Sequence, residues 1–380
     1  MRTTLDKYLT RRSFLLAGGA GLLAAVPLVR AGLGAASGPH DVFLSASDDA
    51  DGRHFVTACD VRGATLFSVE VETRCHGVAL HRAHPDRAVV IARRPGTLAY
   101  DVDVRAGGIR RVLHAAPDRH FYGHAAFSRD GRVLFTSEND IPRGRGVVAV
   151  RDADDLRVLA EIPSFGVGPH ELIALPDGRT LAIANGGLVT DLADGKRRRD
   201  LNVPTMDPSL VYVDVRDGKV LEQVRPDDHF ASVRHLALAP DGTVAVAMQY
   251  EGPEANPYPV LGFHRGGTTI ASADIPRDLR VRMQRYAASV CVAPSGVAAV
   301  TCPRGDVAAF FDVATGALLE SHEVRDAGGV ATVAGGTCFL VTTGLGETHE
   351  FDAATGRRIG GPGRHDEVRW DNHAVLASPA

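Results

Sequence analysis

A repeated two-strand unit constrains the fold of this chain more than any other feature of its sequence. Each copy has a polar residue, four or five mostly apolar residues, a tight turn and a second apolar run. The clearest copies are 124–136, 170–184, 235–247 and 289–300, and weaker ones begin at His76, Val330 and His373. Their spacing is close to the period of roughly 40–50 residues that is typical of four-stranded propeller blades.

Third and fourth strands follow most copies, as at 307–312 and 317–323, so that six full units cover residues 76 to 364. One strand remains at the C-terminal end, and three remain at the N-terminal end, at 42–46, 54–61 and 65–71. We therefore predict an all-β, seven-bladed β-propeller over residues 38–380. Its ring is closed by the C-terminal inner strand plus the three N-terminal strands, which removes an exposed sheet edge. A β-sandwich followed by a second β domain is the structural alternative.

The first 37 residues have the pattern of an export signal. Arg11-Arg12 precede Phe14 and Leu15, an apolar run extends to about Val29, and small residues fill 31–37. This pattern predicts a twin-arginine signal peptide over residues 1–37 and a periplasmic location. The alternative is an uncleaved N-terminal anchor. No other segment is long and apolar enough to span a bilayer, so we expect no membrane span in the mature protein.

Composition and motifs exclude several classes of function. The formal net charge is −4, which gives no basic field for nucleic acid. The chain has no G-x-S-x-G, Walker, H-E-x-x-H or C-x-x-C-H motif. Its five cysteines are an odd number. Cys291 and Cys302 lie on one expected hairpin, where Cys291 should face Val300, and this register predicts no disulfide between them.

Five histidines stand at or near the starts of predicted inner strands. In a propeller the first strand of each blade lines the central channel, so these side chains should gather at one mouth of it. The five are His76, His124, His170, His235 and His373. Imidazole is a common ligand of Fe, Cu and Zn, so the ring predicts a transition-metal site. The alternative is that these histidines are structural caps of the inner strands.

Polar residues of the longest loops are expected at the same mouth. As ligand-binding or supporting residues we select Glu138, Asn139, Asp140, Glu171, Asn185, Arg234 and Asn372. Carboxylates beside the histidines would suit Fe, Mn or Zn, whereas Cys75 and Cys302 would supply soft ligands. Each acid has an alternative as the partner of Arg143, Arg145 or Arg234.

Several motifs resemble those of an uncharacterised family, the domain-of-unknown-function family numbered fifteen-thirteen. They include Phe121-Tyr-Gly-His124, Gly166-Val-Gly-Pro-His-Glu-Leu172, Ala184-Asn-Gly-Gly187 and Trp370-Asp-Asn-His373. The resemblance covers nearly the whole mature chain, although residues 188–191 lack the histidine expected after Asn-Gly-Gly. It implies a Tat-exported periplasmic propeller, often encoded beside imelysin-type proteins of iron uptake, and it brings no established activity.

Three functions remain open from the sequence. The first is a periplasmic metal-binding or metal-handling protein linked to iron uptake, with imelysin-type or other iron-uptake proteins as partners. The second is a metal-dependent enzyme that uses an open coordination position. The third is a docking propeller whose histidines are structural.

Overall fold

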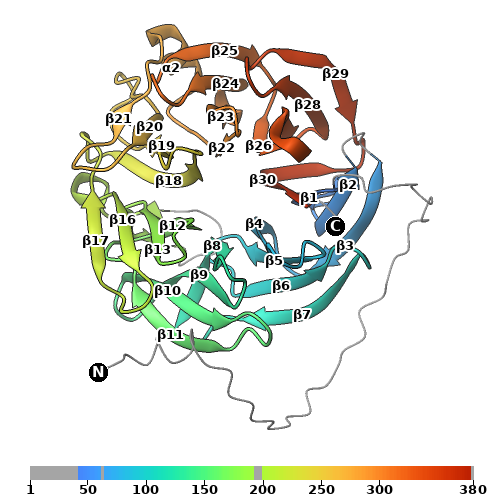
Figure 1. The fold of residues 1–380 in the computed structure, drawn as a ribbon, viewed down its shortest axis with the longest axis vertical. Helices are drawn as coiled ribbons and strands as arrows, with labels where there is room; N and C mark the ends of the chain where they lie inside the picture. Colours follow the sequence, from blue (N-terminus) through green and yellow to red (C-terminus); the bar gives the residue numbers. More distant parts are fainter. Residues whose placement is uncertain (1–41, 61–63, 192–198, 378–380) are drawn as a thin grey trace.

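Antiparallel four-stranded sheets form a ring in this protein. The computed structural model describes residues 42–60, 64–191 and 199–377, and seven four-stranded sheets and one two-stranded sheet lie within them. Figure 1 shows the seven larger sheets arranged in chain order around a central axis. The predicted all-β, seven-bladed β-propeller is therefore confirmed. The predicted signal peptide, residues 1–37, lies outside the described residues.

We number the blades along the chain and name each strand from the channel outward. Blade 1 contains β4 (Cys75–Leu80), β5 (Arg87–Ala92), β6 (Leu98–Asp103) and β7 (Gly108–His114), and blade 2 contains β8 (Arg119–Phe127), β9 (Val133–Asp140), β10 (Arg145–Asp152) and β11 (Val158–Pro163). Blade 3 contains β12 (Pro169–Ala174), β13 (Thr180–Asn185), β16 (Ser209–Asp214) and β17 (Val220–Val224), and blade 4 contains β18 (Ala231–Leu238), β19 (Val244–Tyr250), β20 (Leu261–His264) and β21 (Ala271–Ser272). Blade 5 contains β22 (Ser289–Val292), β23 (Val297–Cys302), β24 (Val307–Asp312) and β25 (Leu318–Glu323), and blade 6 contains β26 (Ala327–Thr332), β27 (Cys338–Thr343), β28 (Glu347–Asp352) and β29 (Arg358–Arg364).

Blade 7 is built from both ends of the described chain. Its strand order is β30 (Arg369–Ala377), β1 (Val42–Asp48), β2 (His54–Asp60) and β3 (Thr65–Val71). Strand β1 pairs with β30 from Val42–Ala377 to Asp48–Arg369. These hydrogen bonds close the ring in the way that the sequence predicted, because they join strands from both ends of the described chain in one sheet.

The second strands are the most deeply buried parts of the blades. Every residue of β5, β13 and β23 is buried, whereas the outer strand β7 is largely exposed. The reason is that both faces of a middle strand pack against neighbouring blades, as Phe310 of blade 5 does against Phe339 and Phe351 of blade 6. Such strands are therefore continuous apolar runs rather than alternating ones.

Turn chemistry follows the sequence pattern, with one error of register. Between β24 and β25 the Asp312 carboxylate accepts the Thr315 N–H at 2.8 Å, and Gly316 takes a φ of +78° that favours glycine. Between β22 and β23, however, Cys291 faces Ala299 rather than the predicted Val300. The turn closes between Ala293 and Val297 and is centred on Ser295, which shifts the register by one residue. All five cysteines are free.

The remaining helices and short strands lie in the loops. A short hairpin of β14 (Thr190–Asp191) and β15 (Arg199–Asp200) precedes η1 (Val203–Thr205) in blade 3, and α2 (Arg277–Arg282) follows blade 4. The other short helices are η2 (Pro303–Gly305) and η3 (Ala334–Gly336). Among the described residues, no helix has both the length and the apolar character needed to cross a membrane.

Candidate metal centre

A β-bulge interrupts each inner strand that carries one of the five predicted histidines. In β4, β8, β12, β18 and β30 the inner strand has extra residues relative to its partner, and the irregularity lies at or beside the histidine. In β12, for example, Pro169 faces Asn185 and Leu172 faces Ile183, so His170 and Glu171 lie within the bulge. Bulges change the direction of side chains and recur beside functional sites. Here they accompany imidazoles that point to the channel axis.

The five imidazoles meet as a closed ring across the channel. Neighbouring ring centroids are 4.4–5.0 Å apart around the circuit His76, His124, His170, His235, His373 and back to His76. The structure thus brings together all five histidines that the sequence singled out. Four of them are buried and His170 is partly buried. We call this set the histidine ring.

Two glycines make this close approach possible. A Cβ on Gly77 would lie 2.4 Å from the Gly123 carbonyl oxygen and 2.8 Å from Nδ1 of His124. Gly123 has a φ of +103°, and a Cβ there would lie 2.8 Å from Cδ2 of His76. A larger residue at either position would force blades 1 and 2 apart or displace an imidazole.

The nitrogen atoms form two overlapping groups that could each hold a metal ion. One group is His76, His124 and His373, and the other is His124, His170 and His235. Within each group the candidate ligand atoms all lie within 4.8 Å of one another. His124 belongs to both groups and is therefore the candidate ligand that they share.

Carboxylates outside the ring orient two of its imidazoles. Nδ1 of His76 lies 2.7 Å from Oδ1 of Asp371, and Nδ1 of His235 lies 3.1 Å from Oε2 of Glu171. A neutral imidazole that donates Nδ1–H to a carboxylate keeps the lone pair of Nε2 for a metal ion. Asp371 is in turn held by Arg74, whose Nη2 is 2.8 Å from Oδ2. His76 and His235 are therefore oriented to bind a metal ion through the lone pair of Nε2.

Burial keeps the ring uncharged. It lowers the pKa of all five imidazoles, that of His124 to about 3. For His170, His235 and His373, neighbouring imidazoles lower the pKa further. The Asp371 and Glu171 carboxylates oppose this effect at His76 and His124 without cancelling it. At neutral pH the imidazoles are neutral, which is the form that binds metals.

Several nitrogen atoms of the histidine ring lack a hydrogen-bond partner outside the ring, within the described part of the chain. Nε2 of His373 lies 3.2 Å from Nε2 of His76. Nε2 of His124 and Nδ1 of His170 are buried and have no hydrogen-bond partner there. Because leaving a buried polar atom unsatisfied costs about 1–3 kcal/mol, these atoms point to a ligand between the imidazoles.

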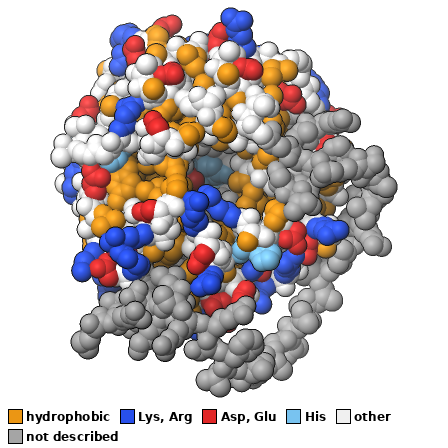
Figure 2. Space-filling view, viewed as in Figure 1, with side chains coloured by type: hydrophobic (Ala, Val, Ile, Leu, Met, Phe, Trp, Pro, Cys, Tyr) orange, Lys and Arg blue, Asp and Glu red, His pale blue; other side chains and the backbone are white. Residues whose placement is uncertain are grey.

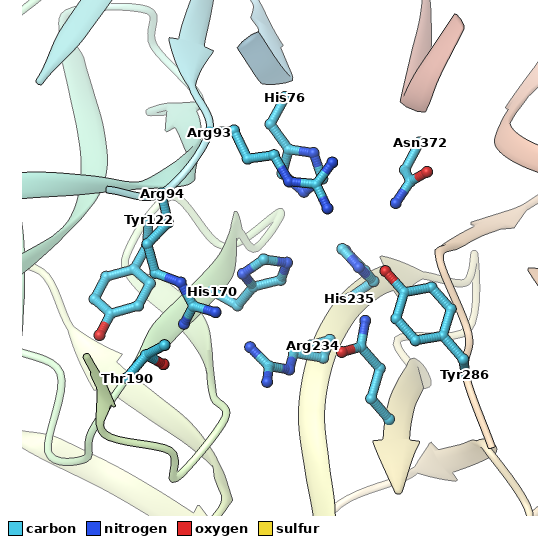
Figure 3. Close-up of a pocket in the computed structure, with 11 residues that line it drawn as sticks. His76, Arg93, Arg94, Tyr122, His170, Thr190, Arg234, His235, Tyr286 and Asn372 are labelled. Atoms are coloured by element: carbon cyan, nitrogen blue, oxygen red, sulfur yellow. The ribbon is translucent and has the colours of Figure 1, made fainter. Parts of the chain in front are cut away.

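Two cavities flank the ring along the channel. One, of about 260 Å³, is lined by His76, His170 and His235 together with arginines and tyrosines from the loops (Figure 3). The other, of about 670 Å³, is lined by His124 and His373 and by later residues of the inner strands, such as Val78, Ile173 and Val290. Figure 2 shows the face where this larger cavity opens, with hydrophobic side chains around a central hollow. The ring separates a cavity lined by three arginines from a larger cavity lined mainly by aliphatic residues of the inner strands.

Of the other predicted site residues, Glu171, Arg234 and Asn372 lie at the ring or its cavities. Glu138, Asn139, Asp140 and Asn185 instead have partners elsewhere. Glu138 pairs with Arg151 at 2.6 Å, and Asp140 pairs with Arg119, Arg143 and Arg145. Asn139 contacts His120, and Asn185 donates to the Ser164 carbonyl. The partners of Glu138, Asn139 and Asp140 lie within blade 2, whereas Asn185 ties β13 to the segment that follows β11, so all four residues have structural partners.

The expected soft ligands are also placed away from the ring. Cys75 packs with Leu44, Val90 and other apolar residues between blades 7 and 1, and Cys302 packs between blades 4 and 5. Burial raises the pKa of both thiols, so neither is a ready thiolate. The donors at the centre are nitrogens.

Sequence reasoning missed several residues of the centre. Asp371 lies two positions before His373, and Tyr122 two before His124, inside motifs from which only the histidines and Asn372 were selected. Arg93 and Arg94 directly follow β5, at the start of a loop between second and third strands. The rule that selected Glu138, Asn139 and Asp140 from a loop between second and third strands could have found both arginines.

Fold and site together define a seven-bladed β-propeller with a buried all-histidine cluster at the centre of its channel. The chain belongs to the family described as "Protein of unknown function (DUF1513)", whose model matches residues 69–377. This confirms the resemblance seen in the motifs. No curated protein matches the sequence.

A solved structure shares the fold. Hydrazine synthase of Kuenenia stuttgartiensis superposes with a TM-score of 0.60 at 14% sequence identity, over 86% of this chain and 100% of that chain. At this level of sequence identity, the similarity shows a shared propeller architecture and gives no information about the activity of the present protein.

Proposed function

We propose that this protein is an exported metal-binding or metal-handling protein that holds a transition-metal ion within the histidine ring. The observation that carries the proposal is the convergence of five uncharged imidazoles, two of them oriented by carboxylates. Nitrogen-rich sites of this kind suit Fe, Cu or Zn. The link to iron uptake and to an imelysin-type partner is the part of the proposal that rests on family resemblance.

The spacing of the imidazoles supports metal binding. With a metal–nitrogen distance of about 2.1 Å, two ligand nitrogens lie ~3.0 Å apart at right angles and ~3.4 Å apart in a tetrahedron. The 3.2 Å between Nε2 of His76 and Nε2 of His373 falls between these values. Within each group the candidate ligand atoms all lie within 4.8 Å of one another, close to the ~4.2 Å that separates opposite ligands of one ion.

Structural histidines elsewhere in the molecule bond differently. Nε2 of His81 lies 2.9 Å from the Gly131 carbonyl oxygen, and Nε2 of His322 lies 2.8 Å from that of Gly356. Both histidines tie one blade to the backbone of the next. The hydrogen-bond partners found for the ring imidazoles among the described residues are carboxylates, a hydroxyl and another imidazole. This difference favours ligation over a capping role.

Elemental analysis of the protein exported from a native-like host tests the proposal. We expect bound Fe, Cu or Zn in the wild type and its loss in the double variant His124→Ala/His235→Ala. The control is His322→Ala, which should lower stability and keep the metal. A wild type that is metal-free and gains no thermal stability from added Fe, Cu, Zn or Mn would overturn the proposal, because a ligand of the folded state must raise apparent stability.

Export and partner are tested separately. Changing Arg11 and Arg12 together to Lys should leave precursor in the cytoplasm, because the export receptor distinguishes guanidinium from ammonium groups. Titration with a purified imelysin-type protein should give a saturable complex. Normal periplasmic accumulation of the variant would contradict the location, and no binding would contradict the partner.

A metal-dependent enzyme is the second candidate. The polar cavity beside His76, His170 and His235 favours it, because an ion in the ring could keep one coordination position open on that side. Turnover that disappears with the metal and returns on reloading would establish this function.

A further inference from the structure

The polar cavity beside the histidine ring is lined by positive charge. Arg93, Arg94 and Arg234 line it, and no Asp or Glu does so within the described part of the chain. Figure 3 shows the three guanidinium groups arranged around the imidazole of His170. Three cations lining one small cavity create a field that attracts an anion.

The carboxylates nearest to these arginines lie outside the lining of the cavity. Nη1 of Arg93 is 3.5 Å from Oδ2 of Asp371, but that carboxylate also serves His76 and Arg74. Arg234, with 2% of its surface exposed, has an Nη2 that lies 4.0 Å from Oε1 of Glu251. A metal ion in the ring would add further positive charge at the floor of the cavity. The described side chains that line the cavity thus carry positive and no negative charge, which favours a negatively charged occupant.

The neutral lining offers hydrogen bonds to such an occupant. Tyr122, Tyr286 and Asn372 carry donors, and Figure 3 shows all three around the same space. The Arg94 guanidinium carbon lies 5.3 Å from the centroid of the Tyr122 ring, which holds the planar group in place. Planar guanidinium groups match the oxygens of carboxylate and phosphate. The volume of about 260 Å³ suits a small molecule.

We propose that this cavity binds a small oxyanion, a carboxylate or a phosphate, whose oxygen completes the coordination of the metal ion in the histidine ring. The inference rests on the proposed metal site and names the class of ligand that the site takes. The anion enters from the side of the three arginines, because the Glu171 carboxylate lines the opposite cavity and would repel it. In that opposite cavity Arg82 is the arginine among the described lining residues.

Cobalt-loaded protein provides the test. Co²⁺ in place of the native metal gives a visible absorption that responds to its ligands. Oxalate, citrate and phosphate are titrated separately, with erythritol as the uncharged control. We expect a saturable change of the Co²⁺ absorption with at least one oxyanion and none with erythritol. The tightest of the three anions distinguishes a carboxylate ligand from a phosphate ligand.

Two variants assign the binding to the arginines. Arg94→Gln and Arg234→Gln should each weaken oxyanion binding by about tenfold or more and keep bound Co²⁺, because each removes a charged hydrogen-bond donor. Arg94 is only half-buried, so its variant should fold even if that of buried Arg234 does not. The matched control is Arg82→Gln in the opposite cavity, which should bind both Co²⁺ and oxyanion as the wild type does.

The outcomes separate this inference from the proposed function. Protein that binds Co²⁺ but shows no spectral response to any oxyanion overturns the inference and leaves the metal site standing. Calorimetric binding of an oxyanion with unchanged absorption overturns coordination to the metal. Protein that takes up no Co²⁺ overturns both.

Discussion

Five inner strands bring a histidine to the channel, and two, β22 and β26, do not. Strand β22 has Ser289 near that level and pairs with β23 in regular register. Strand β26 has a bulge like the histidine strands, but glycines occupy it, at Gly328 and Gly329. A bulge in an inner strand therefore does not by itself supply a ligand.

The two blades without histidine provide support and space. Ser289 Oγ lies 3.5 Å from Nδ1 of His373, and a Cβ on Gly328 would lie 3.4 Å from the Asp371 carbonyl oxygen. The small residues of β26 leave room for the segment that carries Asp371, the carboxylate that orients His76. A scaffold of seven similar blades thus carries an asymmetric site. Five blades each provide an imidazole, and the other two have small residues beside the ring.

The largest effect should come from removing the N-terminal strands. Strand β30 carries His373, but β1–β3 complete its sheet from the other end of the chain. Deletion of residues 42–72 should abolish cooperative thermal unfolding, because blades 1 and 6 lose their neighbour and sheet edges are exposed. Calorimetry measures this, with a variant lacking only residues 1–37 as the control. A truncated protein that melts like the control would contradict the closure of the ring through β30.

His124→Ala should have the next largest effect, because His124 belongs to both candidate ligand groups. We expect metal affinity to fall by about 100-fold or more, beyond the usual loss from removing a residue that only supports a ligand. Competition with a chelator measures the affinity, and His81→Ala is the control outside the ring. Equal affinities of His124→Ala and wild type would show that the two groups do not share this ligand.

Asp371→Asn should weaken metal binding by about 10-fold to 100-fold, since it disturbs the orientation and basicity of His76. The matched control is Asp101→Asn. Asp101 is also a buried carboxylate paired with an arginine, Arg87, at 2.9 Å, but it contacts no ring imidazole. Both variants should lose stability, and only Asp371→Asn should lose metal. If the two variants lost metal to the same extent, the effect of Asp371 on the metal would be explained by stability alone.

Substitutions of Gly123 and Gly328 compare how tightly the inner strand is packed in a blade with a ring histidine and in a blade without one. Gly123→Ala should destabilise the fold by about 1–3 kcal/mol, because its positive φ strains any other residue, and should also displace His76. Gly328→Ala should cost less, since its Cβ would meet nothing closer than 3.4 Å. Chemical denaturation and metal affinity are the measurements. A reversed order would mean that blade 6 and not blade 2 limits the packing of the ring.

Ser289→Ala should have the smallest effect, a loss of metal affinity of about threefold or less. The contact of Ser289 with His373 is at the long limit for a hydrogen bond and adds little. Chelator competition under the conditions used for His124→Ala measures the difference. A loss as large as that of His124→Ala would place blade 5 among the donors and remove the contrast between the two kinds of blade.

The sequence by itself determined the ring of blades, its closure and the identity of the five histidines. These follow from local patterns: short apolar runs, turns with Asp and Gly, and a polar residue at or near the start of each inner strand. A repeat places equivalent residues at equivalent points of the scaffold. Convergence of His76, His124, His170, His235 and His373 could therefore be predicted without any knowledge of their contacts.

Only the tertiary structure decided which polar residues join them. Glu138 and Asp140 are acidic residues near the same loops as the ring, yet each pairs with arginines of its own blade, while Asp371 reaches His76 across the junction of blades 7 and 1. Bulges, which shift a side chain by one position, also have no clear signature in these apolar runs. Both depend on contacts between distant segments, because the choice of partner for a buried charge is set by the packing around it.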